Sequence, residues 1–204
     1  MRFLDTAEIH SLADASGPRY GTLVLTAAFT GLRFGELAAL HLEDLNLLKR
    51  TLTVSRTLSE VAGVVEMTEP KTKAARRTVA LPATVARVLG DHIQAHSSEQ
   101  GIVFASPAGD YLRRTNFRLR HWLPAVRNSV GEPCRFHDLR HSHVSLLIQA
   151  GEHPKTIAAR LGHKSVRTVL DVYGHIYEGM DEEAAGRLEE AISHHLAASM
   201  RPGA

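Results

Sequence analysis

The feature that most constrains the fold is a single interruption in an otherwise helical spacing of hydrophobic residues. Between Thr51 and Leu81 the pattern becomes alternating and β-branched, with turn residues at Gly63 and Pro70. Alternation with a period of two is typical of half-buried strands, whereas the flanking segments follow the helical period. We therefore expect an α+β fold that is mainly helical, with a small three-stranded antiparallel sheet packed on a helical core. The strands are expected at residues 51–55, 64–68 and 78–81.

The helices around this sheet are expected to form one domain, residues 1–204, because no repeat or low-complexity linker divides the chain. The stretch 19–30 is almost wholly apolar and indicates a buried helix that ends at Gly31. Residues 181–200 are amphipathic with an acidic first turn, so this helix packs either on its own core or on a neighbouring protomer. Further helices are expected at about residues 6–15, with Thr6 as the cap, 34–40, 83–97, 114–128 and within 136–173.

Charge is unevenly distributed along the chain, although its net value is only +2. Residues 71–180 carry 16 Lys and Arg against 8 Asp and Glu, while both ends are acidic. A basic middle indicates a surface that faces an anion, and nucleic acid is the commonest large polyanion. The alternative is a solvated face of mixed charge. Lys71 and Lys73, in a basic turn at the tip of the sheet, either face the anion or protect an edge strand.

Composition excludes several classes of protein. Cys134 is the only cysteine, which rules out an intramolecular disulfide and a cysteine-rich zinc module. The longest apolar runs are too short to span a bilayer, and no signal-peptide pattern opens the sequence. We therefore expect a cytoplasmic protein without a membrane segment.

The stretch from Phe136 to Tyr173 contains the residues with the most distinctive chemistry. His137 and Arg140 are three residues apart, so both project from the same face of one helix. His163 follows at a Leu-Gly-His break between helices, and Tyr173 lies ten residues later. An arginine, two histidines and a tyrosine close together indicate a site for an anionic group with a hydroxyl nucleophile beside it.

The segment HDLRH also resembles the HExxH helix of zinc hydrolases, with His137 and His141 four residues apart. That signature requires a glutamate beside the first histidine to activate water, and this chain has the shorter Asp138 there. Arg140 would in addition place a fixed positive charge near the metal. An anion site is therefore favoured over a zinc site.

Five segments form a recognisable pattern in a fixed order: TGLRFGEL, PKTKAARRTVAL, HDLRHSH, LGH and YGH. Through them the chain resembles the catalytic domain of the tyrosine recombinase (phage integrase) family, from Phe3 to about Gly179. The resemblance implies catalytic roles for Arg33, Lys71, His137, Arg140, His163 and the nucleophile Tyr173, with Glu36 orienting the first arginine. Lys73 is the alternative to Lys71, and Tyr177 is the alternative nucleophile.

The resemblance implies a site-specific DNA recombinase that cleaves and rejoins strands through a 3′-phosphotyrosyl intermediate, without metal, ATP or another cofactor. Two arginines suit this chemistry, because they are permanently charged donors for the non-bridging oxygens of a phosphate. Tyr173 would attack the phosphorus and His137 would accept its proton. Lys71 would protonate the departing 5′ oxygen, and His163 would hydrogen-bond the phosphate.

Double-stranded DNA at attachment or recombination sites is the implied partner. Family members usually carry an N-terminal helical domain that clamps the other side of the DNA, and this chain begins almost where the catalytic domain begins. We expect a homotetramer on DNA for a full-length protein, and a monomer with weak binding and slow cleavage for the domain alone. The alternative function is a non-catalytic DNA-binding regulator. The DNA contacts are expected from Lys73, Arg76, Arg77, Arg114 and Arg118.

Overall fold

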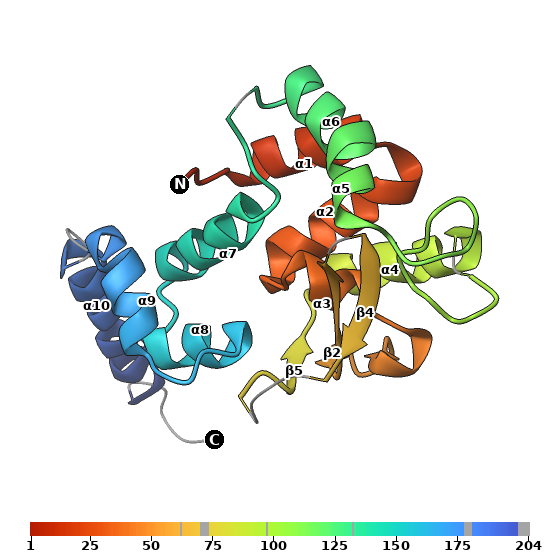
Figure 1. Ribbon diagram of the computed structural model, residues 1–204. Coiled ribbons are helices and arrows are strands. Elements are labelled where there is room, and N and C mark those ends of the chain that lie inside the picture. Colours follow the sequence, from red (N-terminus) through yellow and green to blue (C-terminus); the bar gives the residue numbers. More distant parts are fainter. Residues whose placement is uncertain (62, 70–73, 97, 132, 178–180, 200–204) are drawn as a thin grey trace.

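The computed structural model describes residues 1–61, 63–69, 74–96, 98–131, 133–177 and 181–199 (Figure 1). It is a mainly helical α+β structure with a small antiparallel sheet, as expected. The helices are α1 (Thr6–Ala15), α2 (Gly17–Thr30), α3 (Phe34–Ala38), α4 (Ala83–His96), α5 (Arg114–Phe117), α6 (Leu123–Asn128), α7 (Asp138–Gln149), α8 (Pro154–Leu161), α9 (Arg167–Tyr173) and α10 (Asp181–Ser199). A π-helical turn, η2 (Arg118–Trp122), joins α5 to α6, and 3-10 turns are η1 (Leu42–Asp44) and η3 (Gly174–Ile176). In the described part of the chain, no helix is long and apolar enough to cross a membrane.

Helix α2 forms the centre of the main hydrophobic core. Its residues Leu23, Val24 and Ala27 are buried, and helices α1, α4 and α7 pack against it. Gly31 ends α2 as expected, with a left-handed φ of 70° that a side chain would strain. This turn brings Arg33 to the N-terminus of α3.

Helix α1 is capped by a residue other than the one expected. The Asp5 carboxylate accepts a hydrogen bond from the backbone N–H of Glu8 at 2.8 Å, and the Glu8 carboxylate accepts one from the N–H of Asp5 at 3.0 Å. This reciprocal pair is a capping box, and Thr6 is the first residue inside the helix. A carboxylate at this position also suits the positive end of the helix dipole.

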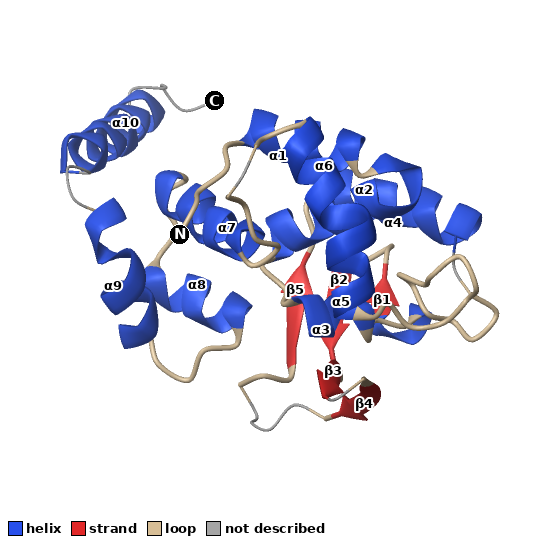
Figure 2. Ribbon diagram, turned by 45° about the horizontal axis from the view of Figure 1, so that its top comes forward, coloured by secondary structure: helices blue, strands red, loops and turns tan. Residues whose placement is uncertain are grey.

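The three-stranded sheet contains different segments from those expected. Its order is β1 (Leu45–Asn46), β2 (Thr51–Val54) and β5 (Arg77–Ala80), with Leu52 opposite Val79. Segment 64–68, expected as the middle strand, is β4 (Val64–Thr68) and pairs instead with β3 (Thr57–Val61) in a separate two-stranded ribbon. Only β2 and β5 alternate between buried and more exposed residues, so only they have a face for the core. The ribbon reaches beyond the helices (Figure 2).

Helix α7 connects two hydrophobic clusters. Leu139 belongs to the main core, whereas Val144 and Ile148 pack with α8 and α9 in the second cluster. In Figure 1, α8, α9 and α10 lie on one side of α7, and the sheet with the first helices lies on the other. On α10, Leu188 and Ile192 are 62% and 45% exposed, so these two residues of its apolar stripe are not packed in the core of their own chain.

Candidate active site

Arg33 and Glu36 form the first half of the site, on helix α3. The carboxylate of Glu36 accepts a hydrogen bond from the backbone N–H of Arg33 at 2.8 Å and one from its Nη1 at 3.1 Å. The Arg33 side chain nevertheless remains 45% exposed, while that of Glu36 is 5% exposed. The buried carboxylate therefore holds an arginine whose side chain remains partly open to solvent.

Arg77 also binds Glu36, although it was expected to contact DNA. Its Nη1 and Nη2 donate to the two carboxylate oxygens at 3.0 and 2.9 Å, and its side chain is 6% exposed. Burial alone would raise the pKa of Glu36, but the hydrogen bonds and charges of Arg77 and Arg33 outweigh it and lower that pKa. Arg77 is thus in the interior and not available to a DNA phosphate, which corrects the expectation. The neighbouring Arg76 is exposed.

Arg140 in the first turn of α7 belongs to the second half of the site. It is 3% exposed, and its guanidinium donates to the carbonyl oxygens of Gly31 at 2.6 Å and Leu161 at 2.9 Å. No carboxylate of the described residues lies within ion-pair distance of it. Burial, and then the charge of Arg33, lower its pKa to about 9. Arg140 is thus a buried cation that is held by carbonyl dipoles and lies near a second arginine. Binding of an anion would offset this uncompensated positive charge.

His163 follows the left-handed Gly162 at the end of α8, as the Leu-Gly-His break predicts. Its Nε2 lies 3.0 Å from Nη2 of Arg140, and since a guanidinium has only donors, this nitrogen accepts and the ring proton resides on Nδ1. Nδ1 is buried and has no partner among the described residues. Burial, followed by the charges of Arg140, Arg33 and Arg77, lowers the pKa of His163 to about 4. The ring is therefore neutral at neutral pH, and its Nε2 accepts a hydrogen bond from Arg140.

Tyr173 ends helix α9 and is 4% exposed. Its hydroxyl lies 2.7 Å from Nδ1 of His141, and burial raises its pKa while the charge of Arg140 lowers it. His137, the expected proton acceptor, is exposed at the start of α7 and meets the His141 ring edge-on at 4.8 Å between centroids. The ring in contact with the tyrosine is thus His141, which sequence reasoning considered only as a zinc ligand. Its spacing of four from His137 was the signal that both rings share one helix face.

Tyr177, the alternative nucleophile, has a different environment. Its hydroxyl is buried without a partner among the described residues. Its pKa is raised first by burial and then by the negative charge of Glu152, whereas Tyr173 is influenced by Arg140. The surroundings therefore favour Tyr173 as the nucleophile.

A groove of about 940 Å³ opens beside Arg33 and His137. Strand β3 lines one side, and the segment that contains Arg114 and Arg118 lines the other. Both of these arginines are exposed and line the groove that also contains Arg33. Lys71 and Lys73 lie outside the described residues.

Comparisons with known proteins identify the family and the fold of this chain. The model of the phage integrase family matches residues 2–180. The chain is 34% identical over 181 residues to the ICEBs1 integrase of Bacillus subtilis (strain 168), covering 85% of this chain and 49% of that protein. It is 28% identical over 207 residues to a tyrosine recombinase XerC-like protein of Caldanaerobacter subterraneus subsp. tengcongensis, covering 90% and 52%. The chain thus spans about half the length of the curated relatives it matches.

Solved structures share the fold. The Tn1549 transposon integrase in complex with transposon right end DNA superposes with a TM-score of 0.74 at 21% identity, covering 94% of this chain and 66% of that one. The catalytic domain of the bacteriophage HP1 integrase gives a TM-score of 0.63 at 18% identity, covering 92% and 94%. These likenesses concern the fold, and the match of the family model to residues 2–180 concerns the sequence. The chain therefore belongs to the phage integrase family.

Proposed function

We propose that this chain is the catalytic domain of a site-specific DNA recombinase that cleaves and rejoins double-stranded DNA through Tyr173. The observation that carries the proposal is the meeting of Arg33, Arg140 and His163, from three distant segments, beside a groove flanked by further arginines. These donors suit the non-bridging oxygens of a scissile phosphate and the extra charge of its transition state. Removal of one such donor typically costs about 3 to 4 kcal/mol in the barrier.

In the proposed step, the Tyr173 oxygen attacks the phosphorus and the bond from phosphorus to the 5′ oxygen breaks. The product is a 3′-phosphotyrosyl link and a free 5′-hydroxyl, so the phosphodiester energy is retained and a second strand can reverse the step without ATP. The proton of Tyr173 passes to the pair His137 and His141, because Nδ1 of His141 lies 2.7 Å from the hydroxyl and the His137 ring packs edge-on against the His141 ring. Lys71, or alternatively Lys73, supplies a proton to the departing oxygen.

The partner and assembly follow from this chemistry as part of the proposal. The substrate is attachment-site or recombination-site DNA, and the enzyme acts in the cytoplasm where that DNA is. We further propose a homotetramer on DNA for the full-length protein. The exposed Leu188 and Ile192 of α10 would then dock on a neighbouring protomer.

The test uses a duplex that carries the repeats flanking the gene, with a nick beside the expected crossover so that cleavage is trapped. We expect a covalent protein–DNA adduct that resists denaturing electrophoresis, forms without metal or ATP, and disappears in Tyr173→Phe. The Tyr177→Phe variant is the matched control and should retain the adduct. Binding without any adduct, unchanged in Tyr173→Phe, would support the non-catalytic regulator instead.

A further inference from the structure

Arg77 joins parts of the molecule that are distant in the sequence. It opens strand β5, and Nε donates to the carbonyl oxygen of Arg160 at 2.6 Å while the rest of the guanidinium binds Glu36 on α3. All its donors are thus directed into the protein, whereas the adjacent Arg76 is exposed. A buried arginine with this many fixed partners is well suited to set the relative position of the elements that it joins.

The first consequence concerns the charge of Arg33. Glu36 Oε1 accepts from Nη1 of both Arg33 and Arg77, and Oε2 accepts from the backbone N–H of Arg33 and from Nη2 of Arg77. These four bonds use the acceptor capacity of the carboxylate, so the Arg33 guanidinium donates only one hydrogen bond to it. Without Arg77, the same carboxylate would be free to take further donors of Arg33 and to neutralise it.

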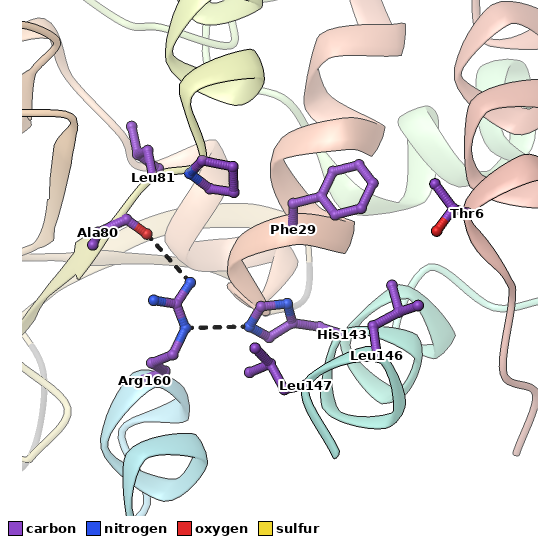
Figure 3. Close-up of a pocket in the computed structure, with 9 residues that line it drawn as sticks. Thr6, Phe29, Ala80, Leu81, His143, Leu146, Leu147 and Arg160 are labelled. Atoms are coloured by element: carbon purple, nitrogen blue, oxygen red, sulfur yellow. Dashed lines mark hydrogen bonds between the residues drawn. The ribbon is translucent and has the colours of Figure 1, made fainter. Parts of the chain in front are cut away.

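The second consequence concerns the turn that carries His163. A Cβ added to Gly162 would lie 3.0 Å from Nη1 of Arg77, so the turn and the guanidinium are in close contact. The side chain of Arg160 adds a second link, donating to the carbonyl oxygen of Ala80 on β5 at 3.3 Å (Figure 3). Helix α8 is therefore attached to β5 at the residues just before His163.

We propose that Arg77 is a positioning residue for the phosphate site, which keeps Arg33 available by occupying Glu36 and holds the turn before His163 against the sheet. This inference rests on the proposed function. It assigns to Arg77 no contact with DNA. Its effect on cleavage is transmitted through Arg33 and His163, which are the groups that meet the phosphate.

The test compares adduct formation on two nicked duplexes that carry either a phosphodiester or a methylphosphonate at the scissile position. The methylphosphonate has no negative charge and so depends less on the charge of Arg33. We expect Arg77→Gln to slow cleavage of the phosphodiester by about 100-fold, a cost typical of a misplaced catalytic group. On the methylphosphonate, the ratio of the wild-type to the variant rate should shrink by about tenfold or more. Arg77→Lys keeps a charge and one bond to Glu36, so its rates should be intermediate.

Arg87→Gln, at an exposed position of α4, is the matched loss of an arginine and should leave both rates unchanged. Equal slowing of both substrates by Arg77→Gln would overturn the inference, because general loosening of the structure does not depend on the charge of the phosphate. Full activity of Arg77→Gln on the phosphodiester would overturn it as well.

A wild-type protein that forms no adduct would contradict the proposed function, and the inference is then decided without DNA. The Nε–H resonance of Arg33, observed by NMR of the ¹⁵N-labelled free protein, should shift in Arg77→Gln and Arg77→Lys and stay in place in Arg87→Gln. A resonance unmoved by both substitutions at Arg77 would overturn the inference.

Discussion

His141 and Tyr173 are in contact through a hydrogen bond of 2.7 Å between the ring Nδ1 and the hydroxyl. The residue before His141 on the same helix is Arg140, whose guanidinium binds His163. Consecutive residues of a helix point about 100° apart. In the first turn of α7, Arg140 therefore points towards His163, whereas His141 points towards Tyr173. The first turn of α7 therefore contacts both Tyr173, the proposed nucleophile, and His163, which is proposed to bind the phosphate.

The hydrogen bond between His141 and Tyr173 can be tested by stability. His141→Phe preserves a ring but leaves the buried hydroxyl without its partner, so we expect a loss of about 1 to 3 kcal/mol in the free energy of unfolding. In the double variant with Tyr173→Phe both polar partners are absent, and most of that loss should be recovered. Urea unfolding of the four proteins measures the coupling. Additive losses would show that the hydrogen bond does not form in solution.

Arg33 and Arg140 should differ in their effect on stability, although both are proposed to bind the phosphate. Arg33→Ala removes an exposed side chain, so we expect cleavage to fall by about 100- to 1,000-fold with little change in the melting temperature. Arg140→Ala should abolish cleavage and also destabilise the protein, because the carbonyls of Gly31 and Leu161 lose their buried donor. Single-turnover cleavage and thermal unfolding separate the two cases. Equal melting temperatures for both variants would contradict the buried position of Arg140.

The arginines beside the groove should contribute to binding. We expect Arg114→Gln and Arg118→Gln each to reduce the slope of the logarithm of DNA affinity against the logarithm of salt concentration by about 1. In an Arg33→Ala background, Arg77→Gln should leave that slope unchanged, because the Arg77 guanidinium is itself turned to the interior. Fluorescence anisotropy with a labelled duplex at several salt concentrations measures this salt dependence of the affinity, with Arg87→Gln as the control. A slope that Arg77→Gln reduces further in the Arg33→Ala background would place Arg77 on the DNA.

Stability should fall as the pH is lowered below about 6.5, the ordinary pKa of histidine. Burial lowers the pKa of His141 to about 4 and that of His143 to about 3, so both rings stay neutral in the folded protein while the unfolded chain binds protons. The contribution of the two neutral rings to the free energy of unfolding is complete above the pKa of the unfolded chain. It is lost as the pH falls towards the lower pKa values that the rings have in the folded protein. Each ring adds a slope of about 1.4 kcal/mol per pH unit in this window.

Urea unfolding at several pH values between about 7 and 5 checks this dependence. His143→Gln should make the slope shallower, and His10→Gln, at an exposed position, should do so less. An identical slope for wild type and His143→Gln would show that His143 is not held neutral by the fold.

Much of the secondary structure could be predicted from local pattern. The apolar run of α2 and the glycine that ends it appear as expected, and the strand expected at 51–55 is found at Thr51–Val54. These features depend on periodicity and on the backbone freedom of glycine, which are local properties. The pairing of β4 was predicted wrongly, because alternation identifies a strand but does not identify its partner.

The sequence by itself determined which residues are brought together for the anion site. Arg140, His163 and Tyr173 were expected close together from residue type and spacing, and the resemblance to the tyrosine recombinase family added Arg33. Only the tertiary structure decided between neighbours. Of Arg76 and Arg77, the second is buried on Glu36, and of His137 and His141, the second contacts the tyrosine. Burial and long-range hydrogen bonding depend on packing between distant segments, which residue type and spacing do not specify.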